Sequence, residues 1–338
     1  MVEVEEIHVA TVNVRNNHDY SPPRNWNDPY SEKPWDERKT RLVDTLLSTG
    51  PLDIAGFQEV LHSQLLDLTH FLGKTYSYVG VGRDDGKEAG EYSPIFYNNE
   101  KYELVDWTTV WLSSTPDVPG SKGWDAALPR IATFLSLRTR TKHRGPLIHA
   151  INTHYDHRGL VARARSSLLI RSQIHRWVGK VEKQENVSEP GVILLFGDFN
   201  SPPHEDGYRN ITSLHPLPSN QPSYTFLDTF THFSTRKYND ESSPVQTRPY
   251  GPVHTYTDFA PPGSRNATRI DFIMLGAGPV SRKLGEIDVG DANGVEGRGG
   301  WVATRYACLD NFVEGDVDGW TGRWSDHRAV RVTVSKGY

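Results

Sequence analysis

The chain has 338 residues, of which 36% are hydrophobic and 23% charged, and these proportions are typical of a globular protein. Its net charge of −5 argues against a passive DNA-binding protein, because such proteins usually carry a basic surface. No stretch approaches the roughly 18 consecutive apolar residues of a membrane span, and the single cysteine, Cys308, excludes an internal disulfide and a thiolate zinc cluster.

The N-terminal segment, MVEVEEIHVATVNV, is acidic and runs directly into a strand-like pattern. A secretory signal would instead open with a basic region followed by an apolar one. Together with the lone cysteine this favours a cytoplasmic location, while secretion after removal of a signal peptide stays open. The sequence contains no internal repeat and no long Pro/Gly/Ser-rich linker, so we expect one domain over residues 1–338; the oligomeric state is left open.

Apolar periodicity and turn residues place the elements of the first half of the chain. Gly50 and Pro51 end the first helix. In chain order, we expect a strand at 7–14, a loop at 20–34, a helix at 35–49, a strand at 52–57, a helix at 62–72, and strands at 76–81, 94–97 and 102–111.

The second half continues with strands at 131–137 and 147–152, the longest helix at 160–181 and a fully apolar strand at 192–196, which should be central in a sheet. A mostly irregular stretch at 214–250 precedes the last clear strands, at 269–275 and 329–334. Strands therefore alternate partly with helices and partly with each other. This order predicts an α/β fold, a four-layer α/β sandwich in which two mixed β-sheets pack face to face with helices outside.

Polar clusters lie at the ends of six of these strands. Alone, an Asp or Asn in such a place is more often a turn former or helix cap, and a lone His is usually structural. If the strands lie side by side, however, several carboxylates gather at one rim and repel each other unless a cation binds among them. Oxygen donors without thiolates favour Mg²⁺ or Mn²⁺ over Zn²⁺. The clusters are Asn13, Gln58-Glu59, residues 153–157, residues 197–200, Asp271 and residues 325–327.

Five short motifs in a fixed order resemble those of the endonuclease/exonuclease/phosphatase superfamily. They are QE at 58–59, NTH at 152–154, GDFN at 197–200, RID at 269–271 and SDH at 325–327. The resemblance spans the chain from Asn13 to the final strand, and segments 79–97 and 111–134 are similar to a subgroup known mainly from bacterial and fungal sequences. It implies a metal-dependent phosphoester hydrolase with the fold expected above, and it leaves the substrate open.

The resemblance also implies a metal site. Glu59 would be the main ligand of Mg²⁺ or Mn²⁺, with Asn13 and Asp326 as direct or water-mediated ligands, and one or two ions would bind. A divalent cation neutralises the growing charge of the phosphate and assists the leaving oxygen.

The same resemblance assigns catalytic roles. Asp198 would orient or deprotonate the attacking water, and Asn200 would position that water or a phosphate oxygen. His154 and His327 would donate hydrogen bonds to phosphate oxygens. Asp271 would keep His327 charged, because a carboxylate next to a histidine favours its protonated form. Glu91 would do the same for His154.

Three further residues have two interpretations each. Arg130 can contact a substrate phosphate through its planar guanidinium, or it forms a surface ion pair. Asp156 and His157 can support His154 from behind, or they can bind a second metal or a substrate hydroxyl.

Three functions are compatible with these patterns. The first is a phosphodiesterase that cleaves a nucleic acid, short or single-stranded, or a nucleotide. The second is a phosphatase or phosphodiesterase acting on a lipid headgroup, inositol phosphate or sugar phosphate. The third, a catalytically dead binding module, is disfavoured because every expected catalytic position is occupied. Loops 15–34, 111–130 and 214–268 are expected to form the walls around the substrate.

Overall fold

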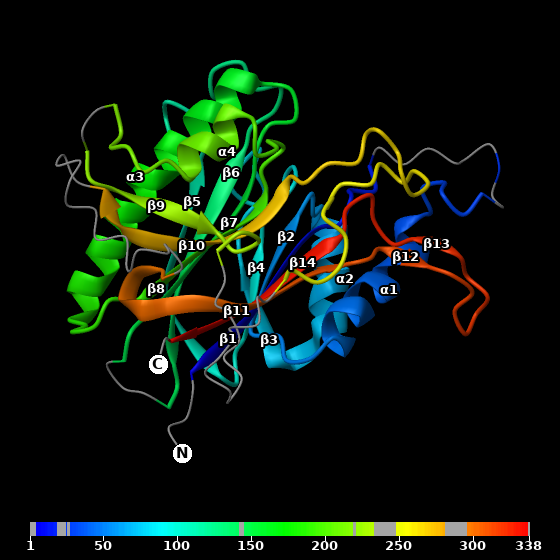
Figure 1. The fold of residues 1–338 in the computed structure, drawn as a ribbon, viewed down its shortest axis with the longest axis horizontal. Helices are drawn as coiled ribbons and strands as arrows, with labels where there is room; N and C mark the ends of the chain where they lie inside the picture. The colour runs from blue at the N-terminus through cyan, green and yellow to red at the C-terminus, as the bar shows by residue number, and fades with distance from the viewer. Residues whose placement is uncertain are drawn as a thin grey trace, which may run out of the picture.

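Two six-stranded sheets pack face to face, and helices cover the outer face of each (Figure 1). The computed structural model describes residues 5–18, 25, 28–141, 145–218, 221–232, 248–280 and 296–336. The four layers confirm the predicted α/β sandwich. Within the described ranges, no helix has both the length and the apolar character needed to cross a bilayer.

The first sheet places the N- and C-terminal strands next to each other. Its strands are β1 (Glu6–Asn13), β2 (Ile54–Gln58), β3 (Tyr76–Val79), β4 (Ile95–Asn98), β11 (Trp301–Leu309) and β14 (Ala329–Lys336). They are arranged in the order β11-β14-β1-β2-β4-β3, in which β1 pairs antiparallel with β14 and parallel with β2. Apolar residues of α1 (Trp35–Ser48) and α2 (His62–Leu72) pack against its outer face.

The second sheet is built around the apolar strand predicted to be central. Its strands are β5 (Tyr102–Trp111), β6 (Ile131–Thr139), β7 (Ile148–His154), β8 (Val192–Asp198), β9 (Ser223–Asp228) and β10 (Asp271–Val280), in the order β5-β6-β7-β8-β10-β9. Every residue of β8 is buried, which confirms its central place. Helices α3 (Leu160–Glu185) and α4 (Asp206–Ile211) cover the outer face. A short ribbon of β12 (Phe312–Val313) and β13 (Gly322–Arg323) and two 3₁₀ turns, η1 (Gly73–Thr75) and η2 (Arg298–Gly300), complete the described elements.

Side chains from both sheets form the central core, and polar contacts lock the sheets together near the strand ends. A Cβ at Gly56 would lie only 2.3 Å from Phe196 Cε2, so glycine at this position permits the close approach of the sheets. Next to it, Gln58 Nε2 donates to Asn152 Oδ1 at 2.7 Å, and Asn152 Nδ2 donates to Phe57 O at 2.8 Å. These contacts hold the end of β2 against the ends of β7 and β8.

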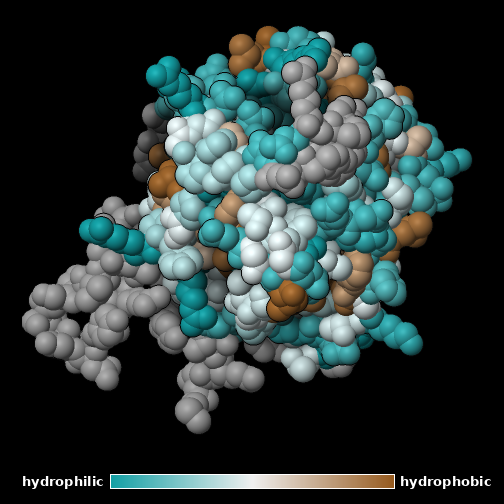
Figure 2. All heavy atoms as spheres, turned by 90° about the vertical axis from the view of Figure 1, so that its right-hand side faces the viewer, coloured by the Kyte–Doolittle hydropathy of each residue, from teal (hydrophilic) through white to brown (hydrophobic). Residues whose placement is uncertain are grey.

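The surface seen from the right-hand side of Figure 1 is mainly hydrophilic (Figure 2). Its apolar side chains lie in small, separate patches. Isolated apolar groups of this kind are normal on a folded protein and do not indicate a partner.

A buried polar network beneath α3 makes the stability of the protein dependent on pH. His149 Nδ1 lies 2.8 Å from Ser136 Oγ, which accepts a hydrogen bond from Trp177 Nε1 at 3.0 Å. Burial lowers the pKa of His149, although Glu182 acts in the opposite direction. His149 is therefore neutral in the folded state.

We expect the free energy of unfolding to decrease as the pH falls below about 6.5, the ordinary pKa of histidine. The unfolded chain then binds a proton at His149 while the folded chain does not, so acidification favours unfolding. Urea unfolding at about pH 7.5 and pH 5.5 measures the effect. The variant His149→Gln should lose less stability between the two pH values, and an equal loss in both proteins would contradict the assignment.

Candidate active site

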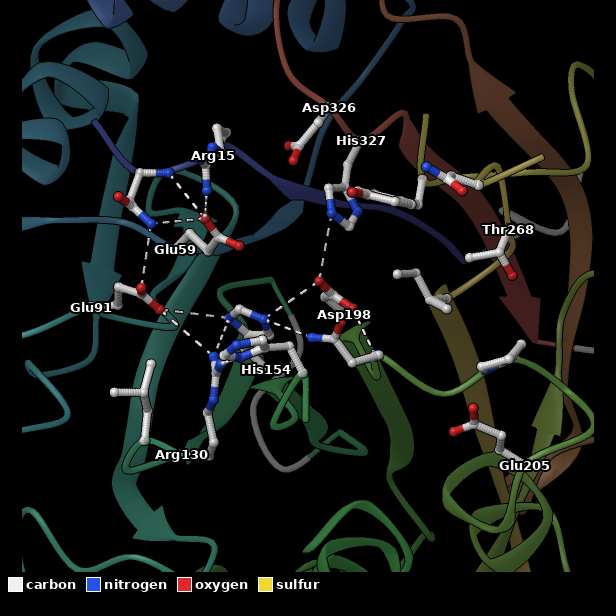
Figure 3. Close-up of a pocket in the computed structure, with 18 residues that line it drawn as sticks. Arg15, Glu59, Glu91, Arg130, His154, Asp198, Glu205, Thr268, Asp326 and His327 are labelled. Atoms are coloured by element: carbon white, nitrogen blue, oxygen red, sulfur yellow. Dashed lines mark hydrogen bonds and ion pairs between the residues drawn. The ribbon is translucent and has the colours of Figure 1, made fainter. Parts of the chain in front are cut away.

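The polar ends of the central strands converge on one cavity of about 520 Å³ (Figure 3). In the second sheet, His154 and Asp271 are the pairing partners of Asp198 on its two sides. In the first sheet, Asn13 pairs with Gln58, directly before Glu59. The nine site residues predicted from the sequence all come together here. Seven line the cavity, namely Glu59, Arg130, His154, Asp198, Asn200, Asp326 and His327, while Asn13 and Asp271 lie behind it, hydrogen-bonded to lining residues.

Left-handed backbone turns direct several side chains into the cavity. Glu59 directly follows β2 and has a φ of 59°, and Asn200 follows β8 with a φ of 45°. Arg15, two residues after β1, also has a φ of 59°. Non-glycine residues rarely adopt this conformation, and they do so mainly where the surrounding structure enforces it.

Gly197 is required by the close packing of β7 and β8 at this site. Its φ is 134°, and an added Cβ would lie 2.0 Å from Thr153 O. We expect Gly197→Ala to destabilise the protein by about 3 kcal/mol or more, because both the backbone and the neighbouring strand would have to shift. Thermal unfolding followed by circular dichroism measures this effect.

Gly179, on the exposed side of α3, provides the matched control. An added Cβ there meets nothing within 4 Å. Gly179→Ala should therefore stabilise the protein by about 0.5–1 kcal/mol, since alanine favours a helix. A melting temperature of Gly197→Ala equal to that of the wild type would contradict the steric argument.

Glu59 lies in a set of hydrogen bonds that keeps its carboxylate ionised. Asn13 Nδ2 donates to Oε1 at 2.9 Å, and the backbone N and Nδ2 of Asn16 donate to Oε2 at 3.1 and 3.0 Å. Burial alone would raise the pKa of Glu59, but the bonds from Asn13 and Asn16 and the charge of Arg15 lower it. The side chain is 15% exposed and faces the cavity.

Asp326 is the second carboxylate on this side of the cavity. Burial and repulsion from Glu59 raise its pKa to about 6, although His327 acts in the opposite direction. Two carboxylates that repel each other form an oxygen donor set that a divalent cation would neutralise. The residues present therefore fit a hard divalent ion.

In a second group of possible metal ligands, a histidine of the group already balances the charge of the carboxylates. Ligand atoms of Asp198, Asp271 and His327 lie within 4.8 Å of one another. His327 Nδ1 is 2.8 Å from Asp271 Oδ2, and Nε2 is 3.7 Å from Asp198 Oδ2. Burial alone would lower the pKa of His327, but the two carboxylates raise it well above the ordinary value. A protonated imidazole has no lone pair for a metal, so His327 is better suited to donate hydrogen bonds.

Asp198 occupies the centre of the cavity floor. Its Oδ1 accepts from Asn200 N at 2.8 Å and its Oδ2 from Asn13 Nδ2 at 3.1 Å. Burial and the charge of Asp271 raise its pKa to about 7, although His327 acts in the opposite direction. A carboxylate that titrates near neutral pH can take a proton from water under physiological conditions.

His154 differs from its expected charged state. Arg130 Nη1 lies 2.9 Å from Nδ1, so Nδ1 accepts from the guanidinium, whereas Nε2, which is 3.0 Å from the Asn200 amide and 3.5 Å from Asp198 Oδ2, carries the one ring proton. Burial and the Arg130 charge lower the pKa of His154 well below its ordinary value. Glu91, expected to keep this ring charged, is 3.8 Å away and more distant than Arg130.

Arg130 is 5% exposed, which excludes the interpretation as a surface ion pair. Besides His154, its guanidinium contacts His157 Nδ1 at 3.0 Å and lies 3.5 Å from Asp156. Asp156 Oδ1 accepts from the backbone N of Arg158 and Gly159, as a turn-forming aspartate does. Arg130 thus fixes the orientation of two histidines of the cavity wall.

The loops predicted to surround the substrate contribute lining residues that the motifs do not reveal. Arg15 and Asn16 come from the first loop. Their position directly after the Asn13 segment is the feature of the sequence that could have identified them as lining residues. The lining residues from the third loop could not be identified in this way, because only folding brings that loop to the cavity. Part of this loop, 219–220 and 233–247, lies outside the described residues. The loop contributes Tyr256, Asn266 and Thr268, and Tyr256 lies with its ring 5.0 Å from that of His327.

Comparisons with known proteins agree with the sequence resemblance. The pattern of the Endonuclease/Exonuclease/phosphatase family matches residues 10–327. A Bacteroides vulgatus endonuclease/exonuclease/phosphatase is 29% identical, with a TM-score of 0.69 and 98% of both chains covered. A mannosyl-6-phosphatase of Bacteroides thetaiotaomicron is 27% identical, with a TM-score of 0.68 over 97% of this chain and 99% of that chain. D. rerio TDP2 complexed with single-strand DNA product is 12% identical, with a TM-score of 0.54 over 97% and 98%, and shares the fold alone. No curated protein matches the sequence.

Proposed function

The chain belongs to the Endonuclease/Exonuclease/phosphatase family and is a metal-dependent phosphoester hydrolase, and on that premise we propose that its substrate is the phosphate ester of a small, hydroxyl-rich compound such as a sugar. The observation that carries this proposal is the chemistry of the cavity wall. Among the described lining residues, five are carboxylates and two are arginines, and Tyr256 is the one phenolic or indole side chain. The carboxylates are Glu59, Glu91, Asp198, Glu205 and Asp326.

Such a wall suits a sugar phosphate better than a nucleic acid strand. A polyanion is held mainly by basic side chains, and unpaired bases need several aromatic rings on which to stack. Carboxylates and amides, such as Glu205 and Asn266 on the wall, can instead hydrogen-bond hydroxyl groups. The likeness to a mannosyl-6-phosphatase at 27% identity supports the same choice. The phosphodiester substrate predicted from the sequence stays a prediction and is the competing proposal.

In the proposed mechanism, the residues of the chain position a water and a phosphate for in-line displacement. A divalent ion, Mg²⁺ or Mn²⁺, held by Asn13, Glu59 and Asp326, would neutralise phosphate charge and stabilise the leaving oxygen. Asp198 takes the proton of the attacking water, since its pKa of about 7 permits this near neutral pH.

The two histidines have different proposed roles because their surroundings differ. His327, kept charged by Asp271, donates through Nε2 to a non-bridging phosphate oxygen. Neutral His154, fixed by Arg130, orients the amide of Asn200, which in turn positions the water or a phosphate oxygen. Arg130 acts on the substrate through these neighbours.

Phosphate release from mannose 6-phosphate and p-nitrophenyl phosphate tests the proposal, with bis-(p-nitrophenyl) phosphate and a single-stranded oligonucleotide as competing substrates. Each is assayed with Mg²⁺, Mn²⁺ or EDTA. We expect the sugar phosphate to give the highest kcat/KM, with activity lost in EDTA. Cleavage of the diesters without turnover of the sugar phosphate would favour the phosphodiesterase, and full activity in EDTA would contradict the metal site.

A further inference from the structure

Arg15 lies at the carboxylates proposed to hold the metal, although no motif assigns it a role. Its Nη1 is 3.9 Å from Glu59 Oε2, and Figure 3 shows it between Glu59 and the side of the cavity that carries Asp326. Its Nε donates to Glu32 Oε1 at 3.2 Å, near the end of the same loop. The guanidinium therefore has one partner at the proposed metal site and another outside it.

The backbone of Arg15 is fixed, whereas its long side chain is 24% exposed. Its N donates to Asn13 Oδ1 at 2.9 Å, and its carbonyl accepts from Arg38 Nη2 at 3.2 Å and Gln64 Nε2 at 3.1 Å. These contacts enforce the left-handed φ of 59°. The side chain of Arg15 can therefore change its position by rotating about its own bonds, while the backbone stays in place.

We propose that Arg15 serves two ligands in turn: it balances the charge of Glu59 while no cation is bound, and, kept at the cavity wall by its bond to Glu32, it contacts the substrate phosphate once a divalent cation lies beside Glu59. This rests on the proposed metal site. A guanidinium and a divalent cation repel each other, so they cannot both stay close to the same carboxylates. A guanidinium held at the cavity wall by Glu32 is well suited to bind phosphate oxygens.

The charges around Arg15 are consistent with this exchange. Although burial acts in the opposite direction, the carboxylates of Asp326, Glu32 and Glu59 raise the pKa of Arg15, which therefore stays charged. Asp326 and Glu59 belong to the proposed metal site, while Glu32 lies outside it. When a cation binds Asp326 and Glu59, Glu32 remains as a partner of Arg15.

The proposal predicts opposite effects of one substitution on two ligands. Arg15→Gln removes the competing charge, so Mn²⁺ should bind about twofold to fivefold more tightly, the effect of a partly exposed ion pair. The same variant should bind inorganic phosphate more weakly when Mn²⁺ is saturating, by about tenfold, because a charged donor is lost. A purely structural role would not change the two affinities in opposite directions.

Isothermal titration calorimetry of the full chain, first with Mn²⁺ and then with inorganic phosphate at saturating Mn²⁺, measures both constants. Arg15→Lys keeps the charge, so its Mn²⁺ affinity should stay near that of the wild type. Glu32→Gln removes the partner that holds Arg15 away from the metal site, so it should weaken Mn²⁺ binding. In a protein that also carries Arg15→Gln, the same substitution should change the Mn²⁺ affinity much less, because the two residues act as a coupled pair. Circular dichroism melts confirm that each variant is folded.

The outcomes separate the two proposals. Unchanged or weaker Mn²⁺ binding by Arg15→Gln would overturn the competition, and unchanged phosphate binding would overturn the phosphate contact. Equal effects of Glu32→Gln with and without Arg15 would show only general charge effects and would also overturn the exchange. If the wild type binds no Mn²⁺, or if Glu59→Gln leaves Mn²⁺ binding unchanged, the proposed metal site itself fails.

Discussion

Replacing Asp198 with asparagine should lower kcat by about 10²–10⁴-fold, the range for loss of a general base. Asparagine keeps the size and an oxygen for the bond from Asn200 N, but it cannot take a proton from water. Initial rates with p-nitrophenyl phosphate at saturating Mg²⁺ measure the change. The melting temperature should stay close to that of the wild type, because the substitution removes a repulsion between Asp198 and Asp271.

The pH profile provides the sharper test of this role. With the pKa of Asp198 raised to about 7, the basic form gains population as pH rises, so the wild-type kcat/KM should rise through neutral pH. Asp198→Asn should lack this rise. Asp125→Asn is a matched control, because Asp125 accepts bonds from Val161 N and Ala162 N at the start of α3 and does not line the cavity, so its loss should leave the pH profile unchanged. Near-normal activity of Asp198→Asn would contradict the assignment.

Much of the fold follows from local sequence patterns. Helix α2 and strand β5 begin and end at the predicted residues, His62–Leu72 and Tyr102–Trp111. In these segments the apolar spacing and the flanking turn residues agree with the tertiary environment. The continuous apolar run of β8 identified the centre of a sheet, because a strand covered on both faces has no polar side.

Two edge strands are missing from the prediction for a physical reason. Strand β9 lies at the edge of the second sheet, within a stretch expected to be irregular, and β11 lies at the edge of the first sheet. The segment Ser223–Asp228 is short and partly polar, and its backbone partner, β10, begins 43 residues later. Edge strands depend on a partner that is distant in sequence, and local propensity carries little information about such pairing.

The convergence of the proposed site residues on one cavity was predictable, but their charge states were not. His154 and His327 each occur in a polar cluster at a strand end, and no local pattern distinguishes their charges. In the fold, His327 meets Asp271 and becomes a cation, whereas His154 meets Arg130 and stays neutral. Burial lowers the pKa of both rings, and the side chains that reverse this shift at His327 or add to it at His154 lie 24 or more residues away in sequence. Spacing within a motif cannot supply that information.

Replacing Glu59 with glutamine should weaken Mn²⁺ binding by at least about 100-fold, since removal of even an outer contact of a metal site costs 10–100-fold. Glutamine keeps one oxygen and can preserve the bond from Asn13, but it lacks the charge that a hard cation requires. Titration calorimetry with Mn²⁺ gives the affinity directly. The activity at low Mg²⁺ should fall in parallel and recover in part at high Mg²⁺.

Asp271→Asn distinguishes the proposed metal site at Glu59 from the group formed by Asp198, Asp271 and His327. If that group held the ion, Asp271→Asn would abolish Mn²⁺ binding and Glu59→Gln would leave it intact. We expect the reverse, because His327 already neutralises Asp271 through the 2.8 Å contact at Nδ1. Asp271→Asn should keep its Mn²⁺ affinity within a few-fold and lose about 100-fold in kcat, since a neutral His327 stabilises phosphate charge less well. Loss of Mn²⁺ binding in this variant alone would move the ion to the side of the cavity where Asp198 and His327 meet.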